Sequence, residues 1–134
     1  MNEHRWLAES ENFKVYSIFD NVYIKKKKKS NSLNQFEKND KHIQWIYGEP
    51  NGAIIMPKED KTIIVGSGIY IYDIKSEKLI EKYNDPKYIK WIDTIYQTEG
   101  DDWLNEFRVV TLNTDDQLRV FKVSISEPTL IEIK

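Results

Sequence analysis

A short segment that occurs twice restricts the fold more than any other feature of the chain. The sequence KHIQWI begins at Lys41, and the sequence KYIKWI begins at Lys87, 46 positions later. Apolar and polar side chains alternate in both segments, as they do in half-buried β-strands. At the same offset, residues 107–112 correspond to residues 61–66. A repeat of this length, with several short strands in each unit, predicts a β-sheet protein built from similar meanders.

The clearest unit lies in residues 61–83 and is typical of three short strands joined by two turns. Gly66, Ser67 and Gly68 end a run of β-branched residues, because glycine adopts backbone angles that other residues avoid. Residues 69–74 then alternate between two faces, and a polar turn leads into the third strand.

The repeat divides the chain into three units, at about residues 1–40, 41–86 and 87–134. A length of 134 residues is usual for one domain, so we expect a single all-β domain. A tryptophan lies near the start of each unit, and aromatic residues at repeated positions usually belong to the core. We therefore expect the following residues to be core residues: Trp6, Trp45 and Trp91.

Residues 60–83 resemble the inner strands of a WD40-type propeller blade. Tyr72 and Asp73 stand where that family carries its Trp-Asp dipeptide. The resemblance implies antiparallel meanders arranged in three propeller-blade-like repeats. A single curved sheet and a small barrel are the alternatives. Residues 86–106 could hold a short helix, because some of their apolar residues fall near helical spacing.

Charge is distributed unevenly, although the formal net charge is only −2. Residues 25–42 carry seven lysines against two acidic residues, whereas residues 93–116 carry seven acidic residues against Arg108. Adjacent lysines repel one another, so we expect Lys25–Lys29 to form a solvated loop. The lysine run lacks interleaved aromatic residues that could stack on bases, which argues against a nucleic-acid partner.

The residue types that catalysis and metal binding require are sparse. The chain has no cysteine, which excludes disulfides and thiolate ligands and fits a reducing compartment. The two histidines, His4 and His42, fall in no catalytic or metal-binding motif. The acidic run at residues 99–102 lacks the ligand spacing of a calcium-binding loop. We therefore expect no catalysis, no cofactor and no metal.

No apolar run approaches the roughly 20 residues that a membrane-spanning helix needs. The segment MNEHRWLAESENF at the start of the chain lacks the apolar core of a signal peptide. The abundance of isoleucine, lysine and asparagine is typical of an AT-rich bacterial genome. These features predict a soluble, cytoplasmic bacterial protein without a membrane partner.

The acidic segment provides the candidate binding site. A large aromatic side chain at the edge of a charged loop can anchor a protein partner while the charges steer it. The alternative is a solvated acidic loop in which Trp103 is a core residue that closes the loop. The candidate partner-binding residues are Asp93, Glu99, Asp101, Asp102, Trp103 and Glu106.

These observations favour a protein-binding domain without catalysis, and specifically an immunity protein that neutralises a bacterial toxin, as in contact-dependent inhibition. The chain is similar in size and composition to several small bacterial immunity proteins. An acidic surface would complement a basic nuclease-type toxin. One alternative is a propeller-like scaffold that assembles with itself or another chain through open sheet edges. Another is a small enzyme of unknown class.

Overall fold

The computed structural model describes residues 4–30, 36–46, 50–83, 89–126 and 130–133. These residues form twelve β-strands and one short 3-10 helix, and the described part of the chain contains no α-helix. The prediction of an all-β fold is confirmed. Residues 89–96, within the range considered for a helix, form a strand instead.

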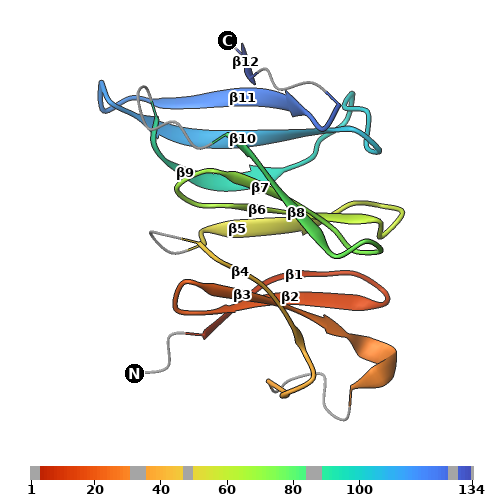
Figure 1. The fold of residues 1–134 in the computed structure, drawn as a ribbon. Coiled ribbons are helices and arrows are strands. Elements are labelled where there is room, and N and C mark those ends of the chain that lie inside the picture. The colour runs from red at the N-terminus through yellow and green to blue at the C-terminus, as the bar shows by residue number, and fades with distance from the viewer. Residues whose placement is uncertain (1–3, 31–35, 47–49, 84–88, 127–129, 134) are drawn as a thin grey trace.

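The strands form three four-stranded antiparallel sheets, and none of them closes into a barrel (Figure 1). The first sheet contains β1 (His4–Glu9), β2 (Phe13–Ile18), β3 (Asn21–Lys26) and β4 (Lys41–Trp45), with the 3-10 helix η1 (Lys27–Lys29) after β3. The second contains β5 (Gly52–Ile55), β6 (Lys61–Val65), β7 (Ile69–Asp73) and β8 (Lys78–Tyr83). The third contains β9 (Ile89–Tyr96), β10 (Glu106–Asn113), β11 (Leu118–Ser124) and β12 (Leu130–Ile133). Within each sheet the strands are adjacent in chain order, so each sheet is a meander.

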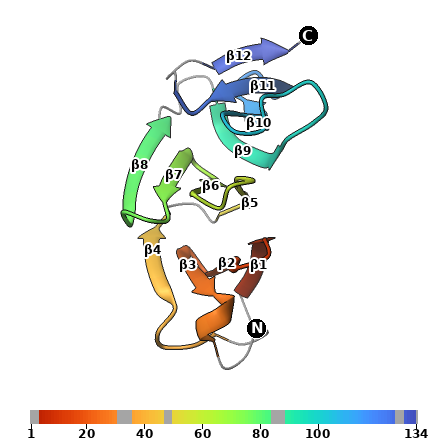
Figure 2. The same ribbon diagram turned by 90° about the vertical axis from the view of Figure 1, so that its right-hand side faces the viewer.

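The three sheets are stacked in chain order, with the second sheet between the other two (Figure 2). The first strand of each sheet lies against the first strand of the next, β1 against β5 and β5 against β9. The Ile92 backbone N–H donates to the Gly66 carbonyl at 2.8 Å, and Asn51 Nδ2 donates to the Ile92 carbonyl at 2.7 Å. This arrangement has the form of propeller blades in an open series. The likeness to a WD40-type blade in particular stays a prediction.

Two hydrophobic cores hold the stack together, one on each face of the second sheet. Ile64 and Tyr70 face the first sheet, where they pack with residues such as Val15. Ile63, the neighbour of Ile64 in β6, faces the third sheet and packs in the cluster that contains Phe107. Successive side chains of a strand point to opposite faces, and a sheet covered on both faces therefore needs a continuous apolar run. The second sheet has such a run in β6.

The prediction that Trp45 opens the second unit is wrong. β4 pairs with β3, and Trp45 lies opposite Asn21, so KHIQWI is the last strand of the first sheet. The segment KYIKWI instead lies in β9 and opens the third sheet. Both segments are edge strands with one buried face, which explains their similarity. The correspondence of residues 61–66 with residues 107–112 is correct, because β6 and β10 are both second strands.

The prediction that Trp45 and Trp91 are buried is also wrong. Their side chains are 52% and 47% exposed, and Trp6 is 37% exposed. The pairing register of β4 shifts at Ile43, two positions before Trp45, and that of β9 shifts at Lys90, directly before Trp91, and again at Asp93. A bulge of this kind adds one residue and reverses the alternation of side chains. As a result, each tryptophan points outward.

The lysine run is not a solvated loop along its whole length. Lys25 lies on β3 and is 0% exposed. Its Nζ donates to Glu37 Oε1 at 2.8 Å and lies 3.0 Å from Asp40 Oδ2. Lys27 Nζ donates to the Ser10 carbonyl at 2.8 Å. The prediction is therefore wrong for Lys25, which forms buried ion pairs with two residues of the segment that connects β3 to β4.

Candidate protein-binding surface

One face of the third sheet packs against the second sheet, and no other described strand covers the opposite face (Figures 1 and 2). Burial alternates along β10, where Phe107 and Val109 are fully buried. The residues between them therefore point to the uncovered side. Directly opposed residues of antiparallel strands share a face. Leu112, which lies opposite both Trp91 and Leu118, therefore marks an apolar row on the uncovered side.

The same face continues across the two last strands. Val120 lies opposite Val110 on one side and Ile133 on the other, and Ile131 lies opposite Lys122. We call this surface the outer face of the third sheet, defined by Trp91, Val110, Leu112, Leu118, Val120, Ile131 and Ile133.

Exposed apolar side chains are concentrated on this side of the molecule. Nine large apolar side chains are exposed among the described residues, and five of them belong to the third sheet or to its β9–β10 loop. These five are Trp91, Trp103, Leu104, Leu118 and Ile131, with exposed fractions from 47% to 66%. Contiguous apolar patches on a protein surface often mark sites of interaction.

The β9–β10 loop is organised around a buried carboxylate. Asp101 is only 8% exposed. Its Oδ1 accepts a hydrogen bond from Arg108 Nε at 3.1 Å and lies 3.8 Å from Lys122 Nζ. Its Oδ2 accepts from the Thr98 backbone N–H at 3.1 Å. Asp101 therefore uses its charge to hold the loop onto β10 and β11.

Glu106 and Asp102 complete the internal network of the loop. Glu106 Oε1 accepts from the Asp102 backbone N–H at 2.8 Å and lies 3.3 Å from Lys122 Nζ. The hydrogen bond from Asp102, followed by the interactions with Lys122, lowers the pKa of the Glu106 carboxyl. Asp102 Oδ1 accepts from the Leu104 backbone N–H at 3.2 Å. These bonds define the turn that precedes β10.

The turn presents Trp103 and Leu104 to solvent, with 47% and 54% of each side chain exposed. Gln97 Nε2 donates to the Trp103 carbonyl at 3.0 Å and to the Glu106 carbonyl at 2.8 Å. The backbone of the loop is thus fixed while two large apolar side chains stay outside. The alternative in which Trp103 closes the loop as a core residue is wrong.

The predicted site residues lie on β9, in the β9–β10 loop and at the start of β10. Five of them lie in the β9–β10 loop or at the first residue of β10, while Asp93 lies on β9. Glu99, Asp102 and Asp93 are exposed, whereas Asp101 and Glu106 take part in internal ion pairs. The exposed carboxylates and Trp103 therefore form the part of the predicted site that a partner can reach.

Sequence reasoning missed the outer face of the third sheet. Its signal was present in β10 and β11, where adjacent residues such as Val109 and Val110, or Val120 and Phe121, are both apolar. A strand with apolar residues on both faces, in a sheet at the end of a stack, predicts an apolar face left outside.

The described residues contain no cluster of three or more potential metal ligands. No helix in the part of the chain that the structure describes is long and apolar enough to cross a membrane. No protein-family model matches the sequence, and no curated protein matches it. The surface is therefore interpreted from its geometry.

Proposed function

We propose that this chain is a non-catalytic protein-binding domain whose partner docks on the β9–β10 loop and the outer face of the third sheet. The observation that carries this proposal is the exposure of five large apolar side chains on this sheet and loop, two of them tryptophans. Tryptophan is among the residues that contribute most to binding energy at protein interfaces. Apolar residues surrounded by charged ones are the usual composition of such surfaces.

The partner that fits best is a basic bacterial toxin, which would make the chain a cytoplasmic immunity protein. The candidate site carries five carboxylates, at Asp93, Glu99, Asp101, Asp102 and Glu106, against the two nearby cations of Arg108 and Lys122. A nuclease must attract nucleic acid, so its active surface is positively charged. Acidic charge therefore speeds the encounter with such a toxin, and apolar contacts slow its release.

Binding kinetics against the product of the neighbouring toxin gene test this proposal. Trp103→Ala should accelerate dissociation about 30-fold, the equivalent of an interface hot spot of about 2 kcal/mol. The double variant Asp93→Asn, Glu99→Gln removes two exposed charges and should slow association and weaken its dependence on salt.

Matched controls lie on the first sheet. Trp45→Ala removes an equally exposed tryptophan, and Glu11→Gln removes an exposed carboxylate. Both controls should bind like the parent chain. Equal kinetics in all variants would exclude the β9–β10 loop from the interface. If no toxin gene lies beside the gene that encodes this chain, the immunity proposal is overturned.

A scaffold that assembles with itself is a second candidate, favoured by one specific observation. Among the described strands, β12 pairs only with β11, so an open strand edge adjoins the uncovered outer face. Exposed edges and apolar faces tend to pair with other chains. The mass in solution separates the two candidates, because an immunity protein can be a monomer. For a scaffold, Leu118→Lys should convert a dimer into a monomer.

A further inference from the structure

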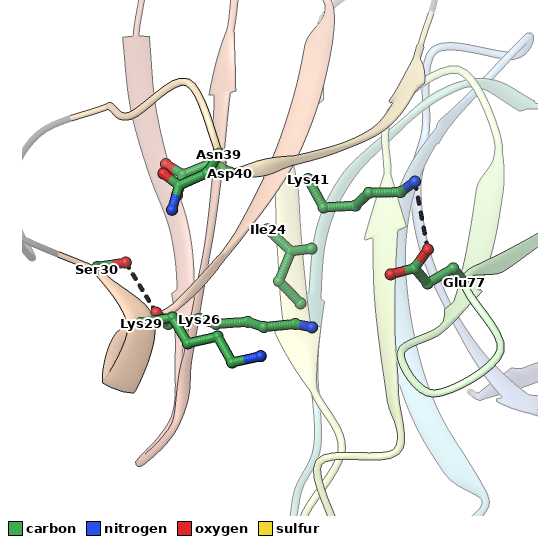
Figure 3. Close-up of a pocket in the computed structure, with 8 residues that line it drawn as sticks. All are labelled: Ile24, Lys26, Lys29, Ser30, Asn39, Asp40, Lys41 and Glu77. Atoms are coloured by element: carbon green, nitrogen blue, oxygen red, sulfur yellow. Dashed lines mark hydrogen bonds and ion pairs between the residues drawn. The ribbon is translucent and has the colours of Figure 1, made fainter.

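Two cavities open beside the 3-10 helix of the first sheet, and one of them extends to Glu77 in the β7–β8 turn of the second sheet. The first has a volume of about 270 Å³ and is lined by Ile24, Lys26, Lys29, Ser30, Asn39, Asp40, Lys41 and Glu77 (Figure 3). The second has a volume of about 260 Å³ and is lined by Asn12, Phe13, Lys26, Lys28 and Lys29. Lys26 and Lys29 line both cavities, which therefore lie next to each other.

Positive charge dominates the lining of these cavities. Four lysines line them against two carboxylates, those of Asp40 and Glu77. Asp40 already pairs with the buried Lys25, and Glu77 Oε2 lies 3.3 Å from Lys41 Nζ. Within the described residues, Lys26 and Lys29 take part in no ion pair. The cavities are thus lined by two cations that no described carboxylate pairs with.

The lysine run divides into two groups with different roles. Lys25 and Lys27 form internal contacts, the first with Glu37 and Asp40 and the second with Ser10 and Glu9. These contacts hold β3 and η1 in place. The side chains between and after them, Lys26 and Lys29, are exposed and line the cavities instead. The positions of the two unpaired cations are therefore set by their paired neighbours.

The backbone at this point is fixed, and the cavity wall is partly apolar. Ser30 Oγ donates to the Lys26 carbonyl at 2.8 Å, which ties the end of η1 to the end of β3 (Figure 3). Ile24 forms an apolar part of the wall, and Asn39 adds a neutral amide. Figure 3 shows the ammonium ends of Lys26 and Lys29 near each other, whereas that of Lys41 is directed to Glu77. An apolar wall lowers the local dielectric constant and strengthens the attraction of an anion.

We propose that these adjacent cavities bind a small ligand that carries a polyphosphate group, such as inorganic tripolyphosphate or a nucleoside triphosphate. Lysine is a common phosphate-binding residue, and its ammonium group acts as a compact positive charge. Lys26 and Lys29 lie between the two cavities. A phosphoryl group in one cavity and a second in the other can therefore contact the same two lysines. Binding relieves the repulsion among unpaired lysines. This site is separate from the proposed protein-binding surface.

Calorimetric titration of the whole chain with tripolyphosphate, and separately with a nucleoside triphosphate, tests the proposal. We expect saturable binding of one ligand per chain, weakened by added salt. The double variant Lys26→Gln, Lys29→Gln should weaken binding at least tenfold. Its thermal unfolding midpoint without ligand should equal or exceed that of the parent, since both side chains lack ion pairs. Tighter binding of the nucleotide than of tripolyphosphate would identify a nucleotide as the ligand.

The matched control is Lys58→Gln with Lys78→Gln, which removes the same charge at exposed positions in the β5–β6 turn and on β8. This control should bind like the parent. An equal loss of ligand affinity in both double variants would show an effect of net charge alone and would overturn the proposal. Absence of saturable binding would also overturn it. Tighter binding of a single-stranded oligonucleotide than of either small ligand would replace it with a nucleic-acid surface.

Discussion

Replacing Lys25 with methionine tests whether the buried ion pairs of the first sheet stabilise the fold. The Lys25 side chain is 0% exposed, and those of Glu37 and Asp40 are 15% and 3% exposed. Methionine keeps most of the apolar stem but removes the charge. Two carboxylates then remain close together with little access to water. Asp40 keeps only two neutral donors, the Tyr16 hydroxyl at 2.8 Å and the Glu37 backbone N–H at 3.2 Å.

The expected loss is large because the remaining charges are uncompensated. Removing one partner from a buried ion pair costs about 3–5 kcal/mol of unfolding free energy. For a chain of this size, 3 kcal/mol corresponds to a decrease of roughly 10 °C in Tm. Lys28→Met, at an exposed position of the same run, should change the unfolding free energy by less than about 0.5 kcal/mol. The difference in unfolding free energy between Lys25→Met and Lys28→Met shows whether the loss comes from the burial of Lys25 or from removing any lysine of the run.

Urea unfolding followed by tryptophan fluorescence measures both variants, with the slope against urea checked for constancy. Adding Glu37→Gln and Asp40→Asn to Lys25→Met removes the two uncompensated charges and should recover most of the lost stability. If Lys25→Met and Lys28→Met unfold at the same urea concentration, the ion pairs contribute nothing and the argument from burial is refuted. Failure of the triple variant to recover would assign the loss to packing.

Two further predictions concern a titratable group and a core residue. Burial, followed by the hydrogen bond to Asp40, raises the pKa of the Tyr16 hydroxyl. Its stabilisation is therefore complete below the pKa of an unfolded tyrosine, about 10, and is lost as the pH rises above it. Urea unfolding between pH 9 and pH 11 should show a smaller loss in Tyr16→Phe than in the parent. Phe107→Ala should cost about 3–5 kcal/mol, because Phe107 is 0% exposed. Trp91→Ala should cost about 1 kcal/mol, because Trp91 is half exposed. If calorimetry gives equal losses of unfolding free energy for Phe107→Ala and Trp91→Ala, the difference in burial between the two residues is contradicted.

The meanders could be predicted where local signals were strong. In β6, β7, β10 and β11, β-branched or alternating residues are bounded by turn residues, and these strands occur close to the predicted positions. β1 was missed because its three apolar residues, Trp6, Leu7 and Ala8, are consecutive and do not alternate with polar ones. It forms by pairing with β2, where Trp6 lies opposite Tyr16, and by contact with β5. Pairing between strands depends on the partner and not on the strand's own alternation alone.

Side-chain environments were harder to predict than strands. The outward direction of Trp45 and Trp91 depends on an extra residue shortly before each tryptophan, which alternation alone cannot reveal. The burial of Lys25 depends on Glu37 and Asp40, which lie 12 and 15 positions further along the chain. A run of like charges appears solvated until such distant partners are known.

The candidate site was predicted in part. Trp103 is exposed beside acidic residues, as its position in a charged loop indicated. Asp101, in contrast, is buried because Arg108 and Lys122 project from neighbouring strands toward it. The pairing of these two strands, with Arg108 opposite Lys122, brings both cations to one carboxylate. Only the tertiary arrangement distinguishes an internal ion pair from a charge available to a partner.

The second sheet is buried on both faces. As a result, the three sheets differ in the free energy needed to expose them to solvent. The first or third sheet can detach by exposing one core, whereas β6 and β7 become fully accessible only when both cores are lost. In a linear array of this kind, opening begins at the ends. Amide hydrogens of the second sheet should thus exchange with solvent most slowly. A partner bound to the outer face would slow exchange in the third sheet first, which makes that sheet the natural reporter of binding.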